Sequence, residues 1–386
     1  MLQGNSADNS RIAWLLPSAF FYWQPALSEF TQLFPQTTVF TGRWHGFAPG
    51  FEDSFTVEVV GTRKVIALTQ ASTGYGSSFT YLSPSILNQL LRFKPHIIFS
   101  SSFGIWTVLA LLLKPLGKWR VVIAYEGSSP SVDYRGSAVR LSFRRAMVQV
   151  ADALITNSQA GKAYLTEVLK ADVDCVFVKP YEVPAARALL GHSGDPEPGD
   201  RQLRRPVFLF VGGVIPRKGL HVLLEACATL QVQGYRDYTL LVVGDGKQRE
   251  ELEAFSKNHD LEACVKWAGR VDYGYLGAYF QSADVFVLPT LEDTWGVVVL
   301  EAMVLGKPVL CSKGAGASEM VVEGENGYLF EPHDPKGLAE VMRRCINNPN
   351  LIVSMGRKSQ QLIAQHTPEA AAQFLAKVTS FVLGNC

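Results

Sequence analysis

Short apolar runs alternate with longer segments of helical periodicity along most of the chain. This alternation is typical of parallel sheets with helices on both faces, whose buried strands read as nearly continuous apolar runs. The strands predicted in the first half are Ile12–Leu16, Val65–Leu68, His96–Ser100, Val121–Ala124 and Ala153–Thr156. Between them we predict helices that include Pro84–Phe93, with Ser83 as its N-cap, and Ser137–Val150.

A second alternation begins at Val207 and repeats the pattern of the first half. Its predicted strands are Val207–Val211, Tyr238–Val243, Val265–Ala268, Asp284–Leu288 and Val309–Ser312. Its predicted helices include Lys218–Leu230 and Val297–Leu305, and Gly306 and Pro308 end the second of these. We therefore predict an α/β protein with two Rossmann-like domains, whose parallel sheets face a central cleft. Ligands of such folds bind in loops that follow the strands.

The segment between the two alternations is rich in Gly, Pro and charge, as expected of a linker. The chain has 386 residues, and single cores stop growing at roughly 250–300 residues. We predict an N-terminal domain over residues 1–190, a linker over 191–206 and a C-terminal domain over 207–365. Residues 366–386 should form a last helix, with Thr367 as N-cap, that packs back on the N-terminal domain.

Composition narrows the class of protein. Lys and Arg total 36 against 35 acids, so the chain as a whole lacks the excess of positive charge that is typical of nucleic-acid-binding proteins. We therefore expect no nucleic-acid partner. The six cysteines show no metal-ligand spacing, which favours reduced core thiols. No apolar run approaches the ~20 residues of a membrane-spanning helix, and the N-terminus lacks the pattern of a secretory signal. We expect a soluble, cytoplasmic protein without a metal or another cofactor.

Gly212 and Gly213 follow a buried strand and precede two cations, Arg217 and Lys218. Glycines let the backbone approach a ligand closely, and a helix N-terminus favours phosphate. The adjacent cations would neutralise a pyrophosphate. A tight turn before a solvated basic helix is the alternative interpretation.

A second candidate segment runs from Pro289 to Leu310. Glu301 lies within the apolar sequence VVVLEAMVL, where an acid is unfavourable unless it is paired or bound. Asp293 lies in the preceding loop, and an ordinary turn residue is its alternative role. The backbone amides near Gly296 and Val297 could face an anion. Further along, small residues up to Gly316, followed by Glu319, would leave room for a sugar, although a connecting loop explains them equally well.

Together these segments resemble the large family of retaining glycosyltransferases with the GT-B architecture and the E-x7-E signature. The resemblance is good from Val207 to about Leu362 and covers the N-terminal half only in broad pattern. It implies a UDP- or GDP-sugar donor, a metal-independent reaction and an acceptor hydroxyl on a small molecule, a glycan or a lipid. It assigns the diphosphate to Lys218, the ribose hydroxyls to Glu301 and the donor sugar to Asp293. Donor-binding roles fall to Gly212, Gly213, Val271, Gly296, Val297, Gly316 and Glu319.

The chain departs from that family at several positions. Gly213 stands where the family usually has Arg, and Arg217 is our candidate to supply the missing charge. Asp293 replaces the first Glu of the signature. The N-terminal loops contact the acceptor in this family, and here Tyr125, Glu126 and His45 are the candidates. Many members of the family have a histidine after a strand of the N-terminal domain, and this chain has Tyr125 and Glu126 there. The acceptor is therefore the least predictable of the ligands.

Other interpretations remain open. A nucleotide-sugar epimerase of similar shape and a non-catalytic nucleotide-sugar-binding subunit are the alternatives. A nicotinamide dehydrogenase is disfavoured because neither first strand is followed by G-x-G-x-x-G. The acidic pair Asp172 and Asp174 lacks the context of a metal site. Arg140, Arg144 and Arg145 lie beside apolar residues on one helix, which we interpret as a solvated face over a core stripe. Contact with an anionic membrane is the alternative.

Overall fold

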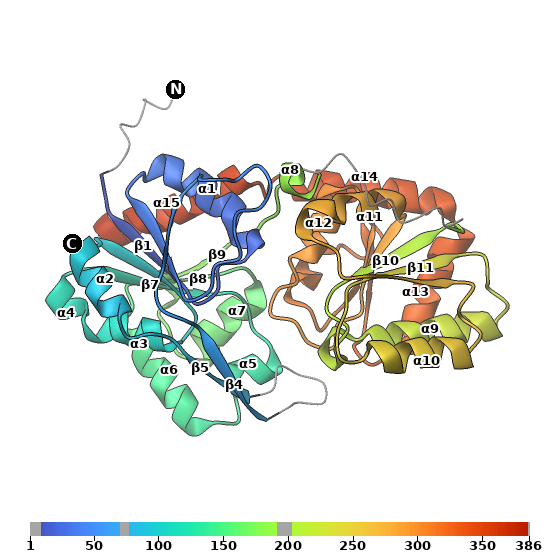
Figure 1. Cartoon of the computed structure of the whole chain (residues 1–386), viewed down its shortest axis with the longest axis horizontal. Helices are drawn as coiled ribbons and strands as arrows, with labels where there is room; N and C mark the ends of the chain where they lie inside the picture. The colour runs from blue at the N-terminus through green and yellow to red at the C-terminus, as the bar shows by residue number, and fades with distance from the viewer. Residues whose placement is uncertain (1–8, 70–76, 191–202, 385–386) are drawn as a thin grey trace. The chain divides into compact units, whose positions relative to one another are not determined.

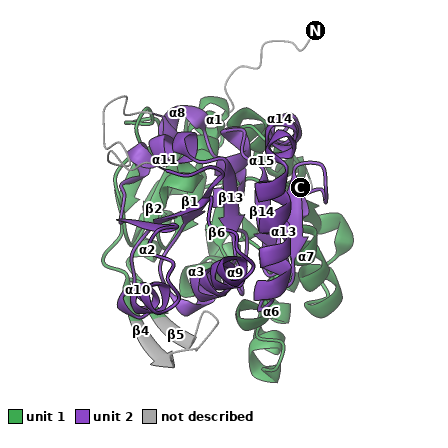
Figure 2. Cartoon of the chain, turned by 90° about the vertical axis from the view of Figure 1, so that its right-hand side faces the viewer, with its two compact units in different colours: residues 1–70, 76–183, 366–386 green, residues 71–75, 184–365 purple. Residues whose placement is uncertain are grey.

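The computed structural model describes residues 9–69, 77–190 and 203–384 (Figure 1). The chain divides into two compact units. The first comprises residues 1–70, 76–183 and 366–386, and the second comprises residues 71–75 and 184–365 (Figure 2). Most of the predicted linker, residues 191–202, lies outside the described residues. The chain thus returns to the first unit at its C-terminal end.

The first unit is built on a parallel sheet of seven strands in the order β3-β2-β1-β6-β7-β8-β9. The order reverses between β1 and β6, as in doubly wound folds. The strands are β1 Ile12–Leu16, β2 Thr37–Thr41, β3 Thr56–Val59, β6 Ile97–Ser101, β7 Arg120–Tyr125, β8 Ala153–Thr156 and β9 Val176–Val178.

Helices cover both faces of this sheet (Figure 1). The last helix, α15 (Pro368–Gly384), packs against α1 (Gln24–Leu33) on one face, and the Thr367 hydroxyl accepts a hydrogen bond from Ala370 N at 3.2 Å. This bond confirms the predicted N-cap. The other face carries most of the remaining helices, which are α2 Ile86–Phe93, α3 Ile105–Leu112, α4 Lys114–Gly117, α5 Pro130–Asp133, α6 Ala138–Val150 and α7 Gln159–Ala163.

The second unit is built on a parallel sheet of six strands in the order β12-β11-β10-β13-β14-β15. Its strands are β10 Val207–Val211, β11 Thr239–Val243, β12 Val265–Gly269, β13 Val285–Leu288, β14 Val309–Ser312 and β15 Gly327–Phe330. Its helices are α8 Ala186–Leu189, α9 Leu220–Val232, α10 Arg249–Asn258, α11 Leu276–Ser282, α12 Val298–Val304, α13 Pro335–Asn347 and α14 Pro349–Ile363. The two-sheet α/β prediction is confirmed.

Several element predictions need correction. Val65–Leu68 does not join the parallel sheet, because β4 (Lys64–Thr69) pairs antiparallel with β5 (Ser77–Tyr81). Strands so close in sequence can pair antiparallel, whereas parallel pairing needs a long crossover. Strands β2, β3, β5 and β15 were not predicted, and β3 is an exposed edge strand.

Two predicted helix starts are also wrong. Helix α2 begins at Ile86 rather than Pro84, with Ser85 at the N-cap position, and the Ser83 hydroxyl accepts from Ser85 N at 3.3 Å in the turn before the helix. Lys218 does not open a helix. It ends a 3-10 turn, Pro216–Lys218, and α9 starts only after Gly219, which has a φ of 68°. That left-handed conformation favours glycine and interrupts the helical run.

The thiols behave as small core groups. Cys227, Cys264, Cys311 and Cys345 are buried and Cys175 is half-buried, and all five are free cysteines. Among the helices that the structure describes, none has the length and apolar character needed to cross a membrane.

Candidate functional site

In the second unit, the strand order reverses between β10 and β13, so the loops that follow these two strands lie next to each other. Ligands of doubly wound folds bind at this switch point. Leu291 N donates to Arg217 O at 2.8 Å, and the Thr290 hydroxyl donates to the same oxygen at 3.0 Å. A Cβ added at Gly219 would lie 2.0 Å from Pro289 O. The two loops are therefore held together by their backbones, and only glycine fits at position 219.

The loop after β14 joins the same assembly. Asp293 N donates to Gly314 O at 2.9 Å, and Gly316 N donates to Asp293 O at 3.1 Å. A Cβ at Gly316 would lie 2.2 Å from Thr294 O, which explains the small residue there. The three segments singled out from the sequence are thus connected in one place.

Arg217, Lys218 and Asp293 form an ion-pair cluster at this switch point. Lys218 Nζ donates to Asp293 Oδ2, and Arg217 Nη1 lies 3.4 Å from Asp293 Oδ1. Arg217 Nη1 also donates to Glu292 O at 2.8 Å. The three side chains are only 9–19% exposed, so their electrostatic interactions are weakly screened. Two cations thus meet the carboxylate of Asp293 at this point, which makes the cluster a candidate site for an anion.

Glu301 lies on α12 and is buried, with 4% of its surface exposed. The Tyr273 hydroxyl donates to Glu301 Oε1 at 3.0 Å. Burial raises the pKa of Glu301 to about 7, and the hydrogen bond from Tyr273 lowers it in part. Burial and the neighbouring carboxylate raise the pKa of Tyr273, which keeps that hydroxyl a donor. The sequence prediction that Glu301 needs a partner holds, but Tyr273 itself was missed.

A pocket of about 520 Å³ opens beside β10 and β11. It brings together Gly212, Gly213 and Val271, three of the predicted donor-binding residues. Its other lining residues were not predicted. They are Val211, Val243, Gly244, Asp245, Gly246, Arg270 and Leu276.

The glycines after β11 let the pocket form. A Cβ at Gly244 would lie 1.8 Å from Gly212 O, and a Cβ at Gly246 would lie 2.3 Å from Val214 O. Two backbone turns therefore pack directly on each other, which side chains would prevent. The Gly244-Asp245-Gly246 sequence directly after a buried strand is the sequence signal from which this side of the pocket could have been predicted.

The remaining predicted donor-binding residues lie along the loops after β13 and β14. Gly296 has a φ of 98° and precedes Val297, the N-cap of α12, so the helix begins one residue later than predicted. Glu319 is exposed on the 3-10 helix Gly316–Met320. The local backbone thus requires glycine at positions 296 and 316, whereas Glu319 is a side chain on the surface.

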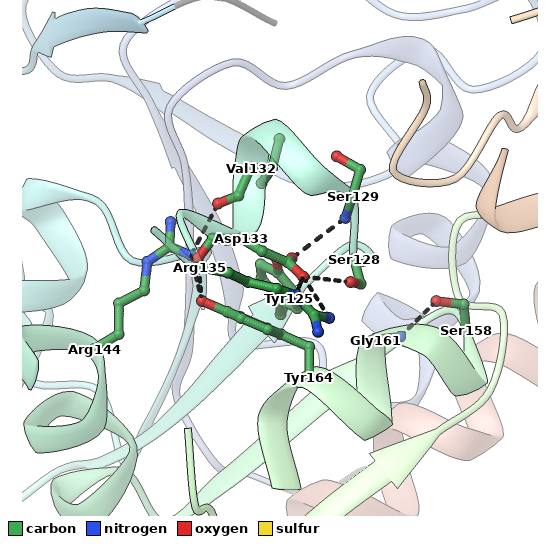
Figure 3. A network of polar contacts seen from close by, with 10 residues as sticks. All are labelled: Tyr125, Ser128, Ser129, Val132, Asp133, Arg135, Arg144, Ser158, Gly161 and Tyr164. Carbon is green, nitrogen blue, oxygen red and sulfur yellow. Dashed lines mark hydrogen bonds and ion pairs between the residues drawn. The ribbon is translucent and has the colours of Figure 1, made fainter. Parts of the chain in front are cut away.

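In the first unit, Tyr125 belongs to a polar network centred on Asp133 (Figure 3). The Tyr125 hydroxyl donates to Asp133 Oδ1 at 2.7 Å, and Tyr125 is 1% exposed. The other Asp133 oxygen accepts from the Ser128 hydroxyl at 2.7 Å and from Arg135 Nε at 2.9 Å. Tyr125 was predicted to face an acceptor, but it lies in the core with its hydroxyl engaged. Its hydrogen bond to Asp133 joins the end of β7 to α5, which follows the loop after β7.

Arg144 completes this network from α6. Its Nη1 donates to Val132 O at 2.9 Å and to the Tyr164 hydroxyl at 2.8 Å, and the Tyr164 hydroxyl donates to Asp133 O at 2.6 Å (Figure 3). Arg144 is 8% exposed. The solvated face predicted for α6 therefore excludes Arg144, which points inward.

Glu126 and His45 lie in loops that follow strands of the first unit. Glu126 is half-buried directly after β7, and its carbonyl accepts from Asn157 N at 3.4 Å. His45 follows β2 and stacks on Phe20 with ring centroids 5.0 Å apart. Asp172 accepts from Asp174 N at 3.1 Å and so serves as a local cap. Within the described residues, no group of three or more His, Cys, Asp or Glu side chains could hold a metal ion.

Comparison with solved structures identifies the fold. The structure of the Anabaena HepE protein in complex with UDP superimposes with a TM-score of 0.72, over 96% of this chain and 99% of that chain. The sequence identity is 18%, so this likeness establishes the GT-B fold alone.

Comparison with curated proteins gives several relatives that are described as glycosyltransferases. One from Methanocaldococcus jannaschii, described as an uncharacterized glycosyltransferase, is 28% identical over 170 residues, covering 44% of this chain and 46% of the relative. The D-inositol 3-phosphate glycosyltransferase of Corynebacterium urealyticum is 27% identical over 257 residues, covering 64% of this chain and 60% of the relative. The chain thus spans about half the length of the curated relatives it matches.

The family match falls on the unit that carries the ion-pair cluster and the pocket. Residues 195–362 match the family described as glycosyl transferases group 1. This match confirms the resemblance inferred from the three sequence segments. In this part of its sequence, the chain is similar to the glycosyl transferases group 1 family.

Proposed function

We propose that the protein transfers a sugar from a nucleotide diphosphate sugar to an acceptor hydroxyl, with retention of the anomeric configuration and without a metal ion. One observation carries the proposal. Arg217 and Lys218 converge on Asp293 at the switch point of the second unit, in the part of the chain that matches the glycosyltransferase family. Partly buried cations at this point can take the role that a metal ion plays elsewhere.

The diphosphate leaving group needs positive charge close to it. When the bond between the anomeric carbon and the phosphate oxygen breaks, negative charge builds on the diphosphate. Lys218 and Arg217 stabilise that charge more strongly in the transition state than in the ground state. The acceptor oxygen bonds to the anomeric carbon from the same face, and its proton passes to the departing phosphate. The amides near Gly296 and Val297 support the sugar or the phosphate.

The nucleoside occupies the rest of the donor site in this proposal. Glu301 accepts hydrogen bonds from the ribose hydroxyls, since an ionised carboxylate is a pure acceptor. The wall formed by Gly212, Gly213 and Val271 receives the base and the ribose. The donor is a UDP or GDP sugar. The HepE structures contain UDP and UDP-glucose, which makes a UDP sugar the first donor to test.

The domains divide the work in the proposal. The C-terminal domain binds the donor, and the N-terminal domain provides the acceptor side through Glu126 and His45. Tyr125 is a positioning residue that acts through Asp133. The acceptor is a small molecule, a glycan or a lipid that carries a free hydroxyl.

A two-step experiment tests this function. Thermal unfolding is first measured with UDP, GDP, ADP and their glucose conjugates, with EDTA present. A nucleotide that binds only the folded state raises the midpoint by mass action. The stabilising donor is then incubated with acceptor sugars, and the product's anomeric configuration is determined by NMR. Retained configuration supports the proposal. Conversion of the donor alone would identify an epimerase, and tight binding without turnover would identify a binding subunit.

A further inference from the structure

Charge is distributed very unevenly along this nearly neutral chain. Residues 59–151 contain eleven Lys and Arg but only two acids, Glu126 and Asp133. The rest of the chain contains 25 Lys and Arg against 33 acids. Asp133 is buried within its own network, so it contributes little to the surface. This segment of the first unit therefore carries an excess of positive charge that the net charge of +1 conceals, although Asp152 just beyond it pairs with Lys114 and Arg120.

Helix α6 presents an apolar stripe to solvent as well as one to the core. The buried side contains Arg144, Met147 and Val148. A second, exposed side contains Val139, Phe143, Ala146 and Val150, spaced i, i+4, i+7 and i+11, which places them in one row. Val139 is 81% exposed and Phe143 is 52% exposed. A solvated helix normally carries polar residues in that row.

The neighbouring helices α3 and α4 repeat this arrangement. Ile105, Leu112 and Leu116 are exposed along these helices, and Leu109 between them is half-buried against the core. Leu112 and Leu116 are each 70% exposed. Single exposed leucines are ordinary, but rows of apolar side chains on adjacent helices mark an interaction surface.

These helices share one side of the first unit. Helix α3 contacts both α4 and α6, and all three cover the same face of the sheet (Figure 1). Lys114 links the two rows, since its Nζ donates to Val150 O at 2.8 Å, and its charge is paired with Asp152 Oδ2 at 2.8 Å. Lys118, Arg140 and Arg145 are exposed beside the rows. We call the outward side of α3, α4 and α6 the α3–α4–α6 surface.

We propose that the α3–α4–α6 surface binds a bilayer that contains anionic lipids. The cations attract the anionic headgroups, while the leucine, valine and phenylalanine rows enter the boundary between headgroups and acyl chains. Nucleic acid would use the charge but would leave the aliphatic rows exposed to water. The proposal does not depend on the proposed function, because binding is measured without turnover.

Vesicle sedimentation tests the proposal with the full chain. One set of vesicles is pure phosphatidylcholine, and the other contains about a third phosphatidylglycerol. We expect sedimentation with the anionic vesicles only, and a decrease as salt is raised, since salt screens exposed charges. Equal binding to both sets, or binding to neither, overturns the proposal.

Matched variants identify the surface. L112S, L116S and F143S together should weaken vesicle binding by at least ~10-fold through lost apolar burial. K118Q with R140Q should weaken it to a similar extent and reduce the salt dependence, at about 1 kcal/mol, or roughly fivefold, per cation. V232S with V353S removes exposed valines of the second unit, and K257Q removes an exposed lysine there. These controls should bind normally.

Two further outcomes would contradict the proposal. In one, light scattering shows a dimer that the triple variant dissociates, so a second copy is the occupant of the surface. In the other, the protein binds heparin or RNA, and the triple variant binds vesicles as well as the unchanged chain does. Unchanged thermal midpoints are expected for all variants, since every substituted side chain is exposed.

Discussion

Lys218 Nζ donates a hydrogen bond to Asp293 Oδ2, although 75 residues separate the two in sequence. The hydrogen bond joins the loop after β10 to the loop after β13. We assign the donor diphosphate to Lys218 and the donor sugar to Asp293. The aspartate therefore contacts the lysine to which we assign the diphosphate. In the proposed function, the diphosphate and Asp293 compete for Lys218.

The first prediction concerns Asp293. In D293N, Lys218 and Arg217 lose their competing carboxylate, so we expect UDP to bind several-fold more tightly, because a like charge a few ångströms away is removed. Turnover should nevertheless fall, since the donor sugar loses its carboxylate partner. Calorimetric titration with UDP and a coupled assay for UDP release measure the two effects. Weaker UDP binding by D293N would show that Asp293 positions Lys218 rather than competing for it.

The second prediction concerns Lys218. In K218A we expect turnover to fall by at least ~10²-fold, the scale of losing one electrostatic stabiliser of the transition state. The KM for the donor should change less than kcat, because the charge develops mainly in the transition state. Steady-state kinetics over a range of donor concentrations measure both constants. K257A, at an exposed lysine on α10, is the control and should be unaffected. Normal turnover by K218A would contradict the proposed mechanism.

The third prediction concerns the pH dependence of donor binding. Burial raises the pKa of Glu301 to about 7, so the carboxylate that accepts ribose hydroxyls forms only as the pH passes through that value. Affinity for UDP-glucose should therefore increase from pH 6 to pH 8. In E301Q the affinity should be lower and nearly independent of pH. Titrations at several pH values test this, and a flat profile for the unchanged protein would contradict it.

The same pKa shift predicts the sign of the change in stability. In the unfolded chain Glu301 ionises near its ordinary value of 4.5, whereas in the folded chain it keeps its proton to about 7. Stability from this group is therefore complete below pH 4.5 and falls as the pH rises to 7, by on the order of 3 kcal/mol. Urea unfolding of E301Q should lack this fall.

Much of this architecture could be read from apolar runs, because parallel strands buried on both faces leave a continuous signal. Val207–Val211 and Val309–Ser312 have the predicted bounds. The edge strand β3 was missed because its side chains are mostly exposed, and the sequence TVEV carries little apolar signal. β4 was given the wrong sheet, since the partner of a strand is a long-range property that its own residues do not encode.

The site residues divide in the same way. Glu301 was found because a carboxylate inside an apolar helix is costly, which is a local signal. Tyr273 was not found, because nothing near it in sequence indicates that it meets Glu301. Tyr125 was misplaced for the related reason that its partner Asp133 lies on a later helix. Local chemistry thus identified candidates, and only the fold identified their partners.

The fourth prediction separates the two costs of a side chain at Gly219. G219A introduces a Cβ that would lie 2.0 Å from Pro289 O and also imposes a φ of 68° on alanine. We expect it to destabilise the protein by about 2–4 kcal/mol and to disturb the loop that holds Lys218. Gly234 is the matched control, with a φ of 89° and nothing within 4 Å of an added Cβ. G234A should therefore show the backbone cost alone, about 1–2 kcal/mol. Equal losses in both variants would mean that the contact with Pro289 is readily relieved.

The fifth prediction compares two adjacent arginines on α6. Arg144 is buried and donates to Val132 O and the Tyr164 hydroxyl, whereas Arg145 is exposed and donates to Val168 O at 3.0 Å. R144Q leaves buried acceptors unpaired and removes packing against Phe103, whose ring centroid lies 4.8 Å from the guanidinium carbon. We expect a loss of about 2–4 kcal/mol for R144Q and at most about 0.5 kcal/mol for R145Q. Urea unfolding measures both, and similar stabilities would show that the network around Asp133 contributes little. Because Tyr125 supports the loop after β7 through that network, R144Q should also raise the KM for the acceptor while leaving the affinity for UDP unchanged.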